Sequence, residues 1–483
     1  MNNHYVWAAV ERIAPQLVTF GVSIVIARLV GPEAYGLVGM LAIFMALGQA
    51  FSELGLSAAI IQRKEVSDDD LMSVFVVNVV AGIAMTLIGC AIAPLVAAFY
   101  NEPKITGLLS AQSLTFVIAS VGAVQAALIS REMRFRFNAK VEVFACFVSA
   151  IVGLVMAFRG FEVWSLVGLG LSRVFTRVCL LWAFRVWQPA GRFSWQAFNG
   201  IWAYSSRLLY ASLLHRVVTN LHSVIIAKVY SPADLGLYTR AYSLQQMPVG
   251  IIAGIVQRVA FPLFSKNQHD LIYLKATLRK QVRLILALVV SGMALLYAIS
   301  EELILLLLGE EWLGAVALLK ILCIAGVFNS IFPLHSNMTM ALGNSKLFFR
   351  VEMIKKIYII LALACVYRFG MNAFAWGMVS VSIFDYFASS WPTRKALGYT
   401  LITHAEDLLP TLLAGVIPVG LLSLVHWSGG LAPIVVICLK ALFIGLFVMI
   451  AMVTFRKTWF KEVWEVVDTG LLARVRLQVE SKL

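Results

Sequence analysis

Apolar stretches about as long as a bilayer is thick follow one another along almost the whole chain, and they limit its possible folds more than any other feature. About 20 residues of helix cross the roughly 30 Å of hydrocarbon in a bilayer. The sequence therefore predicts an all-α integral membrane protein with about fourteen transmembrane helices. The predicted helices lie near residues 6–29, 36–61, 73–99, 107–129, 141–158, 164–186, 204–229, 236–262, 281–300, 313–338, 353–369, 372–391, 407–427 and 433–455.

Composition excludes a water-soluble protein. Hydrophobic residues make up 61% of the 483 residues and charged residues 13%, whereas soluble domains carry about 25% charged residues. No polar stretch is long enough to fold separately. The net charge of +14 is expected of a membrane protein with basic cytoplasmic loops, so we predict no nucleic-acid partner.

Lys and Arg collect in short cytoplasmic loops of membrane proteins, and here they collect in alternate connections. With the N-terminus inside, the predicted inner loops include the basic segments 131–140 and 266–283, whereas the predicted outer segment 301–312 is purely acidic. We therefore predict that both termini are cytoplasmic. The tail, 456–483, mixes aromatic and basic residues and is typical of an amphipathic helix on anionic membrane lipids.

The chain contains an internal repeat. Displaced by 200 residues, Val22–Val38 aligns with His222–Tyr238, and the identical pairs include Pro32 with Pro232 and Gly36 with Gly236. Displaced by 210 residues, Lys140–Val141–Glu142 aligns with Arg350–Val351–Glu352. We predict two six-helix halves, 1–199 and 200–399, followed by a helix pair, 400–455, and the tail, 456–483.

The two copies of the repeat are separated by an even number of predicted helices. Both halves therefore cross the membrane in the same direction. Parallel repeats pack about an axis along the membrane normal, and transporters built from them alternate access to a site near the midplane. The repeat thus predicts a central cavity between the halves and a transporter rather than an enzyme.

Basic residues outnumber acidic ones inside the predicted helices. A charge at the bilayer centre costs at least about 2.5–3.5 kcal/mol, so each needs water, a partner or a function. Guanidinium groups match phosphate oxygens two at a time, so we expect an anionic, phosphorylated substrate. Snorkelling to water is the alternative for arginines near helix ends. The predicted substrate-binding residues are Arg12, Arg207, Arg216, Arg240 and Arg258.

Three carboxylates inside predicted helices are candidates for ion coupling, because such a group can take a proton or help to hold sodium. They are Glu11, Glu53 and Asp385; the alternative for each is a salt bridge. Arg173 and Arg177 lie four residues apart on one helix face. They could contact substrate, or pair with Asp385 or with the other half.

No motif for a metal, a cofactor or catalysis is present in the sequence. Asp68–Asp69–Asp70 follows a basic loop and is typical of a solvated helix start rather than of a metal site. We therefore predict neither a metal nor a cofactor.

Several long segments resemble the polysaccharide exporters of the multidrug/oligosaccharidyl-lipid/polysaccharide superfamily, in the branch of the colanic-acid and teichuronic-acid exporters. They are IARLVGPEAYGLVGM (26–40), GLSAAIIQRKE (55–65), YSPADLGLYTRAYSLQQMP (230–248), EELILLLLGEEWLGA (301–315) and MALGNSKLFFRVEMIKK (340–356). The resemblance covers nearly the whole chain. It implies a bacterial inner-membrane flippase that moves an undecaprenyl-pyrophosphate-linked oligosaccharide to the periplasmic leaflet, driven by H⁺ or Na⁺. Polysaccharide polymerases and glycosyltransferases are the implied protein partners.

Two other functions remain open at this point. A drug or metabolite exporter of the same superfamily should recognise cations and carry more acid than base in its cavity, which the arginines oppose. A non-transporting component of a glycan assembly complex would leave the buried charges unexplained.

Overall fold

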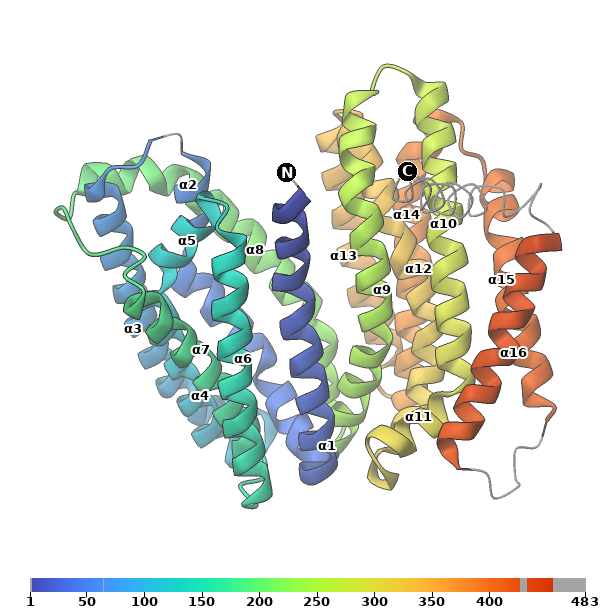
Figure 1. Ribbon diagram of the computed structural model, residues 1–483, viewed down its shortest axis with the longest axis horizontal. Helices are drawn as coiled ribbons and strands as arrows, with labels where there is room; N and C mark the ends of the chain where they lie inside the picture. The colour runs from blue at the N-terminus through green and yellow to red at the C-terminus, as the bar shows by residue number, and fades with distance from the viewer. Residues whose placement is uncertain (1, 64, 426–431, 455–483) are drawn as a thin grey trace, which may run out of the picture. The chain divides into compact units, whose positions relative to one another are not determined.

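The computed structural model describes residues 2–63, 65–425 and 432–454, without the side chains of 2–14, 197, 203, 204, 207, 208, 211 and 253–262. Every regular element in these ranges is helical (Figure 1). The helices are α1 (Asn2–Glu53), α2 (Leu56–Gln62), α3 (Asp68–Tyr100), α4 (Lys104–Val121), α5 (Ala123–Arg131), α6 (Phe135–Phe158), α7 (Trp164–Ala183), α8 (Trp195–Val229), α9 (Pro232–Lys266), α10 (Leu271–Ala298), α11 (Ser300–Leu307), the 3₁₀ helix η1 (Glu310–Trp312), α12 (Gly314–Ala341), α13 (Ser345–Val366), α14 (Met371–Leu397), α15 (Leu401–Ser423) and α16 (Pro433–Thr454).

The predicted all-α membrane fold is confirmed, and within the described ranges most residues of the predicted apolar segments lie in helices. Within the described ranges, nine helices are both long and apolar enough to cross a membrane. The count of fourteen spans therefore stays a prediction. The tail from residue 456 lies outside the described residues.

The structure shows where three predicted segments begin and end. Segments 6–29 and 36–61 lie on separate helices, as predicted, because α1 consists of two helices that meet at a kink at Gly31, where φ is 70° and ψ is 178°. The second segment ends at Glu53, because Leu54 (φ 48°) and Gly55 (φ 70°) adopt left-handed conformations that a helix cannot contain. A new helix, α2, begins after this turn. The segment predicted at 107–129 forms α4 and α5, which meet at Gly122.

The chain divides into two compact units, residues 1–239 and 240–483. Helix α8 contacts α1, α2 and α3, so its packing partners are in the first unit. The boundary between units is therefore later in the chain than the predicted repeat boundary at 199/200, which stays a prediction about the sequence repeat.

The repeat-related segments meet inside the first unit. A Cβ atom added to Gly36 would lie 1.7 Å from the carbonyl oxygen of Pro232, and one added to Gly236 would lie 1.9 Å from the carbonyl oxygen of Pro32. The same contact is thus made twice, with the two segments exchanging roles. Only glycine permits this backbone approach, which explains why both copies of the repeat carry Gly four residues after Pro.

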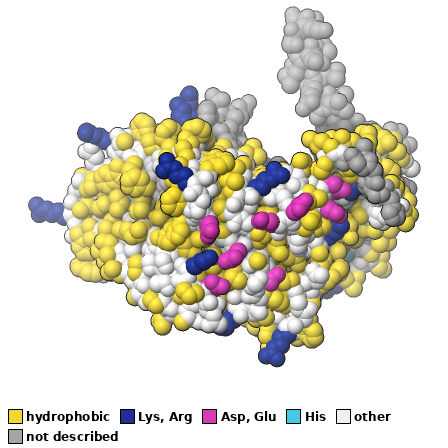
Figure 2. Space-filling view, turned by 90° about the horizontal axis from the view of Figure 1, so that it is seen from below, with side chains coloured by type: hydrophobic (Ala, Val, Ile, Leu, Met, Phe, Trp, Pro, Cys, Tyr) yellow, Lys and Arg dark blue, Asp and Glu magenta, His cyan; other side chains and the backbone are white. Residues whose placement is uncertain are grey.

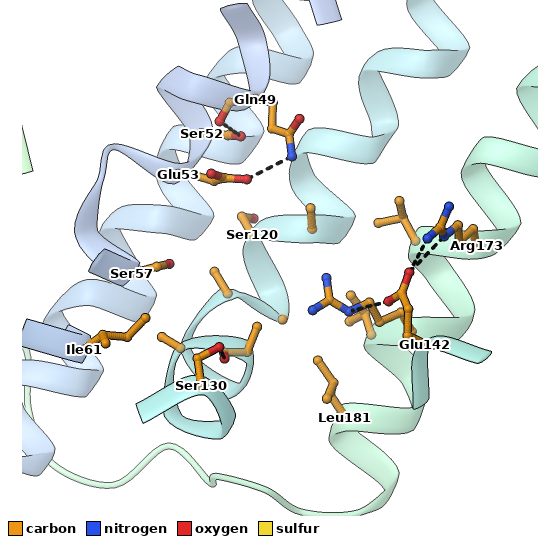
Figure 3. Close-up of a pocket in the computed structure, with 18 residues that line it drawn as sticks. Gln49, Ser52, Glu53, Ser57, Ile61, Ser120, Ser130, Glu142, Arg173 and Leu181 are labelled. Carbon is orange, nitrogen blue, oxygen red and sulfur yellow. Dashed lines mark hydrogen bonds and ion pairs between the residues drawn. The ribbon is translucent and has the colours of Figure 1, made fainter. Parts of the chain in front are cut away.

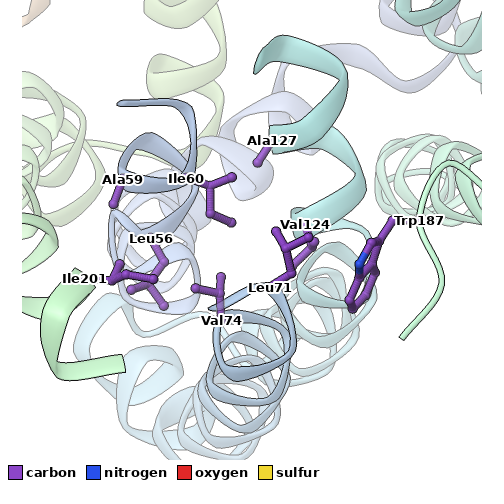
Figure 4. Packing of buried hydrophobic residues seen from close by; sticks show 9 residues of the cluster. All are labelled: Leu56, Ala59, Ile60, Leu71, Val74, Val124, Ala127, Trp187 and Ile201. Carbon is purple, nitrogen blue, oxygen red and sulfur yellow. The ribbon is translucent and has the colours of Figure 1, made fainter. Parts of the chain in front are cut away.

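A hydrophobic cluster packs the short helices of the first unit together (Figure 4). Leu56 and Ile60 of α2 meet Val74 of α3 and Val124 of α5. All four side chains are at most 1% exposed. Because close-packed interiors resist displacement of their parts, this cluster holds α2 and α5 in place, and both helices line the pocket described below.

In the second unit, α12 packs against α14 and α10, and α13 packs against α14. The final pair, α15 and α16, contacts α10, and α16 also contacts α11. Two ion pairs tie this pair to its neighbours: Asp407 of α15 binds Arg279 of α10, and Lys440 of α16 lies 2.6 Å from Glu302 of α11.

The surface is rich in large apolar side chains. On α3, Val80, Leu87 and Leu95 are each more than 60% exposed, as expected where a helix faces lipid instead of water. Seen from the end at which α11 lies, hydrophobic side chains cover much of the surface and acidic ones gather among them (Figure 2). The exposed residues at this end of the second unit include Glu310 and Glu311.

Candidate functional site

A polar pocket lies in the first unit, among helices that are otherwise mostly apolar (Figure 3). Its volume is about 340 Å³, and α1, α2, α4, α5, α6 and α7 contribute to its walls. The polar and charged residues that line it are Gln49, Ser52, Glu53, Ser57, Ser120, Ser130, Glu142, Arg173 and Arg177. We refer to it as the unit 1 pocket.

One wall of this pocket carries two arginines that share one carboxylate. Arg173 Nε lies 3.0 Å from Glu142 Oε1, and its Nη2 contacts the same oxygen. Arg177 Nε lies 3.3 Å from Glu142 Oε2. Both arginines reach α6 because a spacing of four residues places them on one face of α7. Two positive charges against one negative charge leave this wall cationic.

These three charges remain partly accessible. The side chains of Arg173, Arg177 and Glu142 are 34%, 38% and 18% exposed. A guanidinium group has five N–H donors, and one carboxylate cannot occupy the donors of two such groups. The wall can therefore accept a further anion, which would compete with Glu142 for Arg177.

Glu53 lies across the pocket from Glu142 and Arg173 (Figure 3). It stands at the end of α1, and Gln49, one turn earlier, donates a hydrogen bond of 3.0 Å to its Oε1. Within the described part of the chain, no Lys, Arg or His lies within 4.0 Å of the Glu53 carboxylate, and it is only partly buried. The salt-bridge alternative is thus not seen for Glu53, and the pocket has two walls of opposite sign.

The predicted arginines lie in different parts of the chain. Arg216, on α8, is partly buried, and its Nε lies 3.3 Å from Ser212 Oγ. Arg240 is 7% exposed, and its guanidinium carbon lies 5.9 Å from the ring centroid of Trp312. Neither lines the unit 1 pocket. The side chains of Glu11, Arg12, Arg207 and Arg258 are outside the described residues.

Asp385, the third predicted coupling group, lies in the second unit beside α13. It interacts electrostatically with Lys355, Lys356 and Glu352. Its Oδ1 is buried and has no hydrogen-bond partner among the described residues. Lys355 is 4% exposed and donates a hydrogen bond of 2.7 Å to Glu352. Arg173 and Arg177 pair with Glu142 of the adjacent helix, a partner that the sequence did not predict.

The two groups of charges are related by the repeat but differ in composition. Glu142 of α6 and Glu352 of α13 occupy equivalent positions in the two halves. Glu142 meets two cations from the next helix, whereas Glu352 meets Lys355 on its own helix and the next helix brings Asp385. The same local repeat thus holds a cationic surplus in one unit and an additional carboxylate in the other.

Sequence reasoning missed Glu142, since it falls at the predicted start of a helix rather than inside it. A signal was present: the Lys/Arg–Val–Glu triplet occurs in both halves. The Asp68–Asp70 run, in contrast, is a helix start as predicted. Ser67 is the N-cap of α3 and forms a capping box with Asp70.

Comparison with known proteins is informative at the level of the family. Residues 25–317, more than half of the chain, match the family described as polysaccharide biosynthesis protein. The chain belongs to this family. Its resemblance to polysaccharide exporters is thereby confirmed for the family.

Two relatives match this chain over most of its length. The teichuronic acid biosynthesis protein TuaB of Bacillus subtilis (strain 168) is 24% identical over 392 residues, which are 79% of this chain and 80% of the relative. The lipopolysaccharide biosynthesis protein WzxC of Escherichia coli (strain K12) is 26% identical over 348 residues, which are 70% of this chain and 69% of the relative.

Solved structures share the fold of this family member. The lipid II flippase MurJ, in an inward closed conformation, gives a TM-score of 0.75 at 15% identity and covers 94% of this chain and 99% of its own. An inward-facing MATE multidrug transporter gives a TM-score of 0.58 at 13% identity, with 87% and 100% covered. The chain is therefore a multi-pass membrane protein with the fold of these transporters.

Proposed function

We propose that the protein is a flippase of the bacterial inner membrane, with both termini in the cytoplasm. Its substrate is an undecaprenyl-pyrophosphate-linked oligosaccharide repeat unit, which it moves from the cytoplasmic to the periplasmic leaflet by alternating access. Family membership supports this proposal, as do relatives named for teichuronic acid and lipopolysaccharide biosynthesis. In this role the protein transports its substrate chemically unchanged and is not an enzyme.

The observation that carries the proposal is the cationic wall of the unit 1 pocket. A polar pocket within membrane helices is costly unless it is used, and Arg173 and Arg177 together exceed the charge of Glu142. Pyrophosphate and acidic sugars are the parts of the cargo that lipid rejects, and guanidinium groups bind such oxygens in pairs. In this proposal Arg12, Arg207, Arg216, Arg240 and Arg258 supply further substrate contacts.

Transport against a gradient needs a source of energy, and we assign this role to membrane carboxylates. Glu53 faces the unit 1 pocket without a cation within 4.0 Å among the described residues, and Asp385 has a buried oxygen without a hydrogen-bond partner there. Both can exchange H⁺ or Na⁺ as the protein changes conformation; Glu11 is the third candidate. Polysaccharide polymerases and glycosyltransferases are the proposed partners.

Leaflet exchange tests the substrate and the pocket together. Proteoliposomes would contain the full chain and a fluorescent undecaprenyl-pyrophosphate oligosaccharide, with exchange measured by quenching from outside. Replacing Arg177 with Gln should slow exchange by about tenfold, the equivalent of one charge-assisted hydrogen bond of about 1.5 kcal/mol. Arg134→Gln is the matched control, because Arg134 is 44% exposed and does not line the pocket.

A folded protein that exchanges no lipid-linked oligosaccharide would refute the proposed function. Efflux of a cationic dye by the same proteoliposomes would instead support a drug exporter. Equal exchange by the native chain and Arg177→Gln would remove the unit 1 pocket from the substrate path.

Ion coupling has its own test in the same vesicles. Glu53→Gln keeps an amide oxygen that can accept the Gln49 hydrogen bond but cannot release a proton. We expect its exchange rate to become independent of imposed proton and sodium gradients. A gradient response equal to that of the native chain would exclude Glu53 as a coupling group.

A further inference from the structure

Two buried histidines meet in the second unit, away from the groups considered so far. His335 is on α12 and His404 is on α15, and their ring centroids are 5.5 Å apart. Tyr386 of α14 and Tyr399, in the connection between α14 and α15, enclose them. All four side chains are at most 3% exposed. We call these four residues the imidazole cluster.

Hydrogen bonding determines which nitrogen of His335 carries its proton. The hydroxyl of Thr393 has one hydrogen and donates it to the carbonyl oxygen of Ser390, at 2.7 Å. The same hydroxyl lies 2.9 Å from His335 Nδ1. Both bonds form together only if Nδ1 is the donor. Nε2 of neutral His335 is then a lone-pair acceptor.

The Nε2 atom of His335 is buried and accepts no hydrogen bond from the described residues. His404 is in the same situation: its Nδ1 bonds to the hydroxyl of Tyr386, and its Nε2 is buried without a described partner. A buried polar atom without a partner is uncommon and calls for an explanation. Here two of them occur in neighbouring rings.

One proton would satisfy both atoms. An imidazolium and a neutral imidazole can share an N–H···N hydrogen bond, in which one Nε2 donates and the other accepts. A centroid separation of 5.5 Å is short enough for such a bond when the two Nε2 atoms point toward each other. In this arrangement His404 keeps a proton on Nδ1 and donates it to the oxygen of Tyr386.

The charges around the cluster include a nearby carboxylate. Asp407, one turn after His404 on α15, is fully buried and accepts hydrogen bonds from Arg279 Nε (2.8 Å) and Arg283 Nε (2.7 Å) of α10. Burial, with Asp407 as the second cause, raises the pKa of Tyr399. Its hydroxyl therefore stays protonated and donates to Asp407 Oδ2 at 2.6 Å.

The other charged groups at this place are Arg394 of α14, Glu406 of α15 and Lys275 of α10, whose Nζ lies 2.8 Å from the carbonyl oxygen of Gly398, next to Tyr399. Arg394 acts electrostatically on His404, and Glu406 pairs with Arg279. Three arginines and Lys275 thus outnumber two carboxylates, and this surplus of positive charge opposes a further proton while α15 lies against α10. Any movement of α15 away from α10 would free Asp407 from its arginines and favour protonation next to it.

We propose that His335 and His404 form a proton-binding site that holds a single proton between their Nε2 atoms. The site takes up one H⁺ and gains one unit of charge, and no other bond changes. The proposal rests on the proposed function only for its role in transport, because proton binding itself can be measured without substrate.

Nitrogen NMR of the full chain in lipid nanodiscs tests the site directly. With ¹⁵N-labelled histidine, the signals of the pair are assigned by difference from His335→Gln and His404→Gln. At pH 8 we expect His335 to show a protonated Nδ1 and a bare Nε2. Thr393→Val, which removes the acceptor of Nδ1, should abolish this preference. A protonated Nε2 in the native chain at pH 8 would overturn the proposal.

Titration from pH 8 to pH 5 then tests whether the proton is shared. The signals of the two histidines should move with a common midpoint, and His404→Gln should remove the transition of His335. Two independent transitions, or none, would overturn the proposal. Tyr386→Phe keeps both imidazoles and supplies a second variant if His404→Gln does not fold. His269→Gln is the control, because His269 is exposed between α9 and α10.

Lipid exchange in proteoliposomes gives the functional readout. The ratio of exchange rates at pH 6 and pH 8 should approach one in His335→Gln while remaining different from one in the native chain. An unchanged ratio would exclude the site from transport, whereas complete absence of exchange in the native chain would count against the proposed function and leave the NMR result to decide the proton site.

Discussion

Glu142 shows how a single carboxylate organises a charged wall within a membrane helix bundle. It lies between Arg173 and Arg177, each about one-third exposed. The two ion pairs of Glu142 contribute little to the free energy of unfolding. Water reaches them, and partly exposed ion pairs contribute at most about 1 kcal/mol. The larger effect of Glu142 is on one wall of the pocket, where it neutralises one of the two positive charges of Arg173 and Arg177.

Replacing Glu142 with Gln should lower the free energy of unfolding by about 1 kcal/mol, because two guanidinium groups then share a neutral amide. SDS-induced unfolding in mixed micelles measures the change. Adding Arg177→Gln should recover part of the loss, since it removes one of the repelling charges. Glu132→Gln is the control, because Glu132 is 54% exposed and pairs with Arg134 at 3.5 Å; a similar loss in this control would contradict the argument.

Asp407 is the contrasting case of a carboxylate that water does not reach. Its side chain is 0% exposed and holds α15 to α10 through Arg279 and Arg283, with Tyr399 as the third donor. Removing one partner of a buried ion pair leaves uncompensated charge in a medium of low polarity. Arg283 would then lose the Asp407 carboxylate, and Arg279 would keep the more exposed carboxylate of Glu406.

Asp407→Asn should therefore lower the free energy of unfolding by about 3 kcal/mol or more. The neighbouring Glu406→Gln gives the matched comparison, because Glu406 also binds Arg279 but is 55% exposed; its cost should stay below about 1 kcal/mol. Equal costs for the two variants, measured by the same unfolding assay, would show that burial does not determine the strength of this network.

Among the helices, the crossing of the repeat-related segments depends on backbone contact. Gly36 and Gly236 each approach the carbonyl oxygen of the other segment's proline. The kink of α1 at Gly31 immediately precedes this crossing. Because the same contact is made from both sides, the two glycines should be equally intolerant of a side chain.

Gly36→Ala and Gly236→Ala should each destabilise the protein by about 1–3 kcal/mol, as overpacking does, since the added methyl group meets backbone rather than a movable side chain. Gly21→Ala, also in α1, should not, because nothing lies within 4 Å of the added Cβ. Thermal unfolding in detergent compares the three. A tolerant Gly236→Ala would show that the crossing is not held as tightly as its geometry implies.

For the whole molecule, the distribution of charge predicts its orientation. The basic loops predicted on the inside include 266–283, and the acidic segment 301–312 is predicted on the outside. In the structure the basic residues from Lys275 to Arg283 lie in the first half of α10 (Leu271–Ala298), and the acidic segment follows the end of this helix. The 28 residues of α10 are enough to cross the hydrocarbon once. The two segments should therefore lie on opposite sides of the membrane.

Cysteine labelling in intact cells tests this orientation. In a chain whose six native cysteines are replaced, Glu310→Cys should react with a membrane-impermeant maleimide, and Gln268→Cys should react only after the inner membrane is opened. Both positions are exposed, so the difference reports the side of the membrane rather than burial. Labelling of both in intact cells would contradict the predicted topology.

Much of the architecture follows from the sequence alone. Long apolar segments require helices, because in lipid only a helix satisfies all its backbone hydrogen bonds within one segment. The segments 26–40 and 230–248 indicated the family, and the repeat indicated that Gly36 and Gly236 are equivalent. Glu53 was selected because a carboxylate in an apolar helix is costly, and the structure places it in a polar pocket.

Only the tertiary structure decided which charges meet. Glu142 and Arg173 are 31 residues apart, Arg279 and Asp407 are 128 apart, and His335 and His404 lie on different helices. Apolar length and charge patterns specify where a helix begins and what it contains, but not which face it turns to which neighbour. That choice depends on side-chain packing between helices, and it alone brought two arginines to one glutamate and two imidazoles to one another.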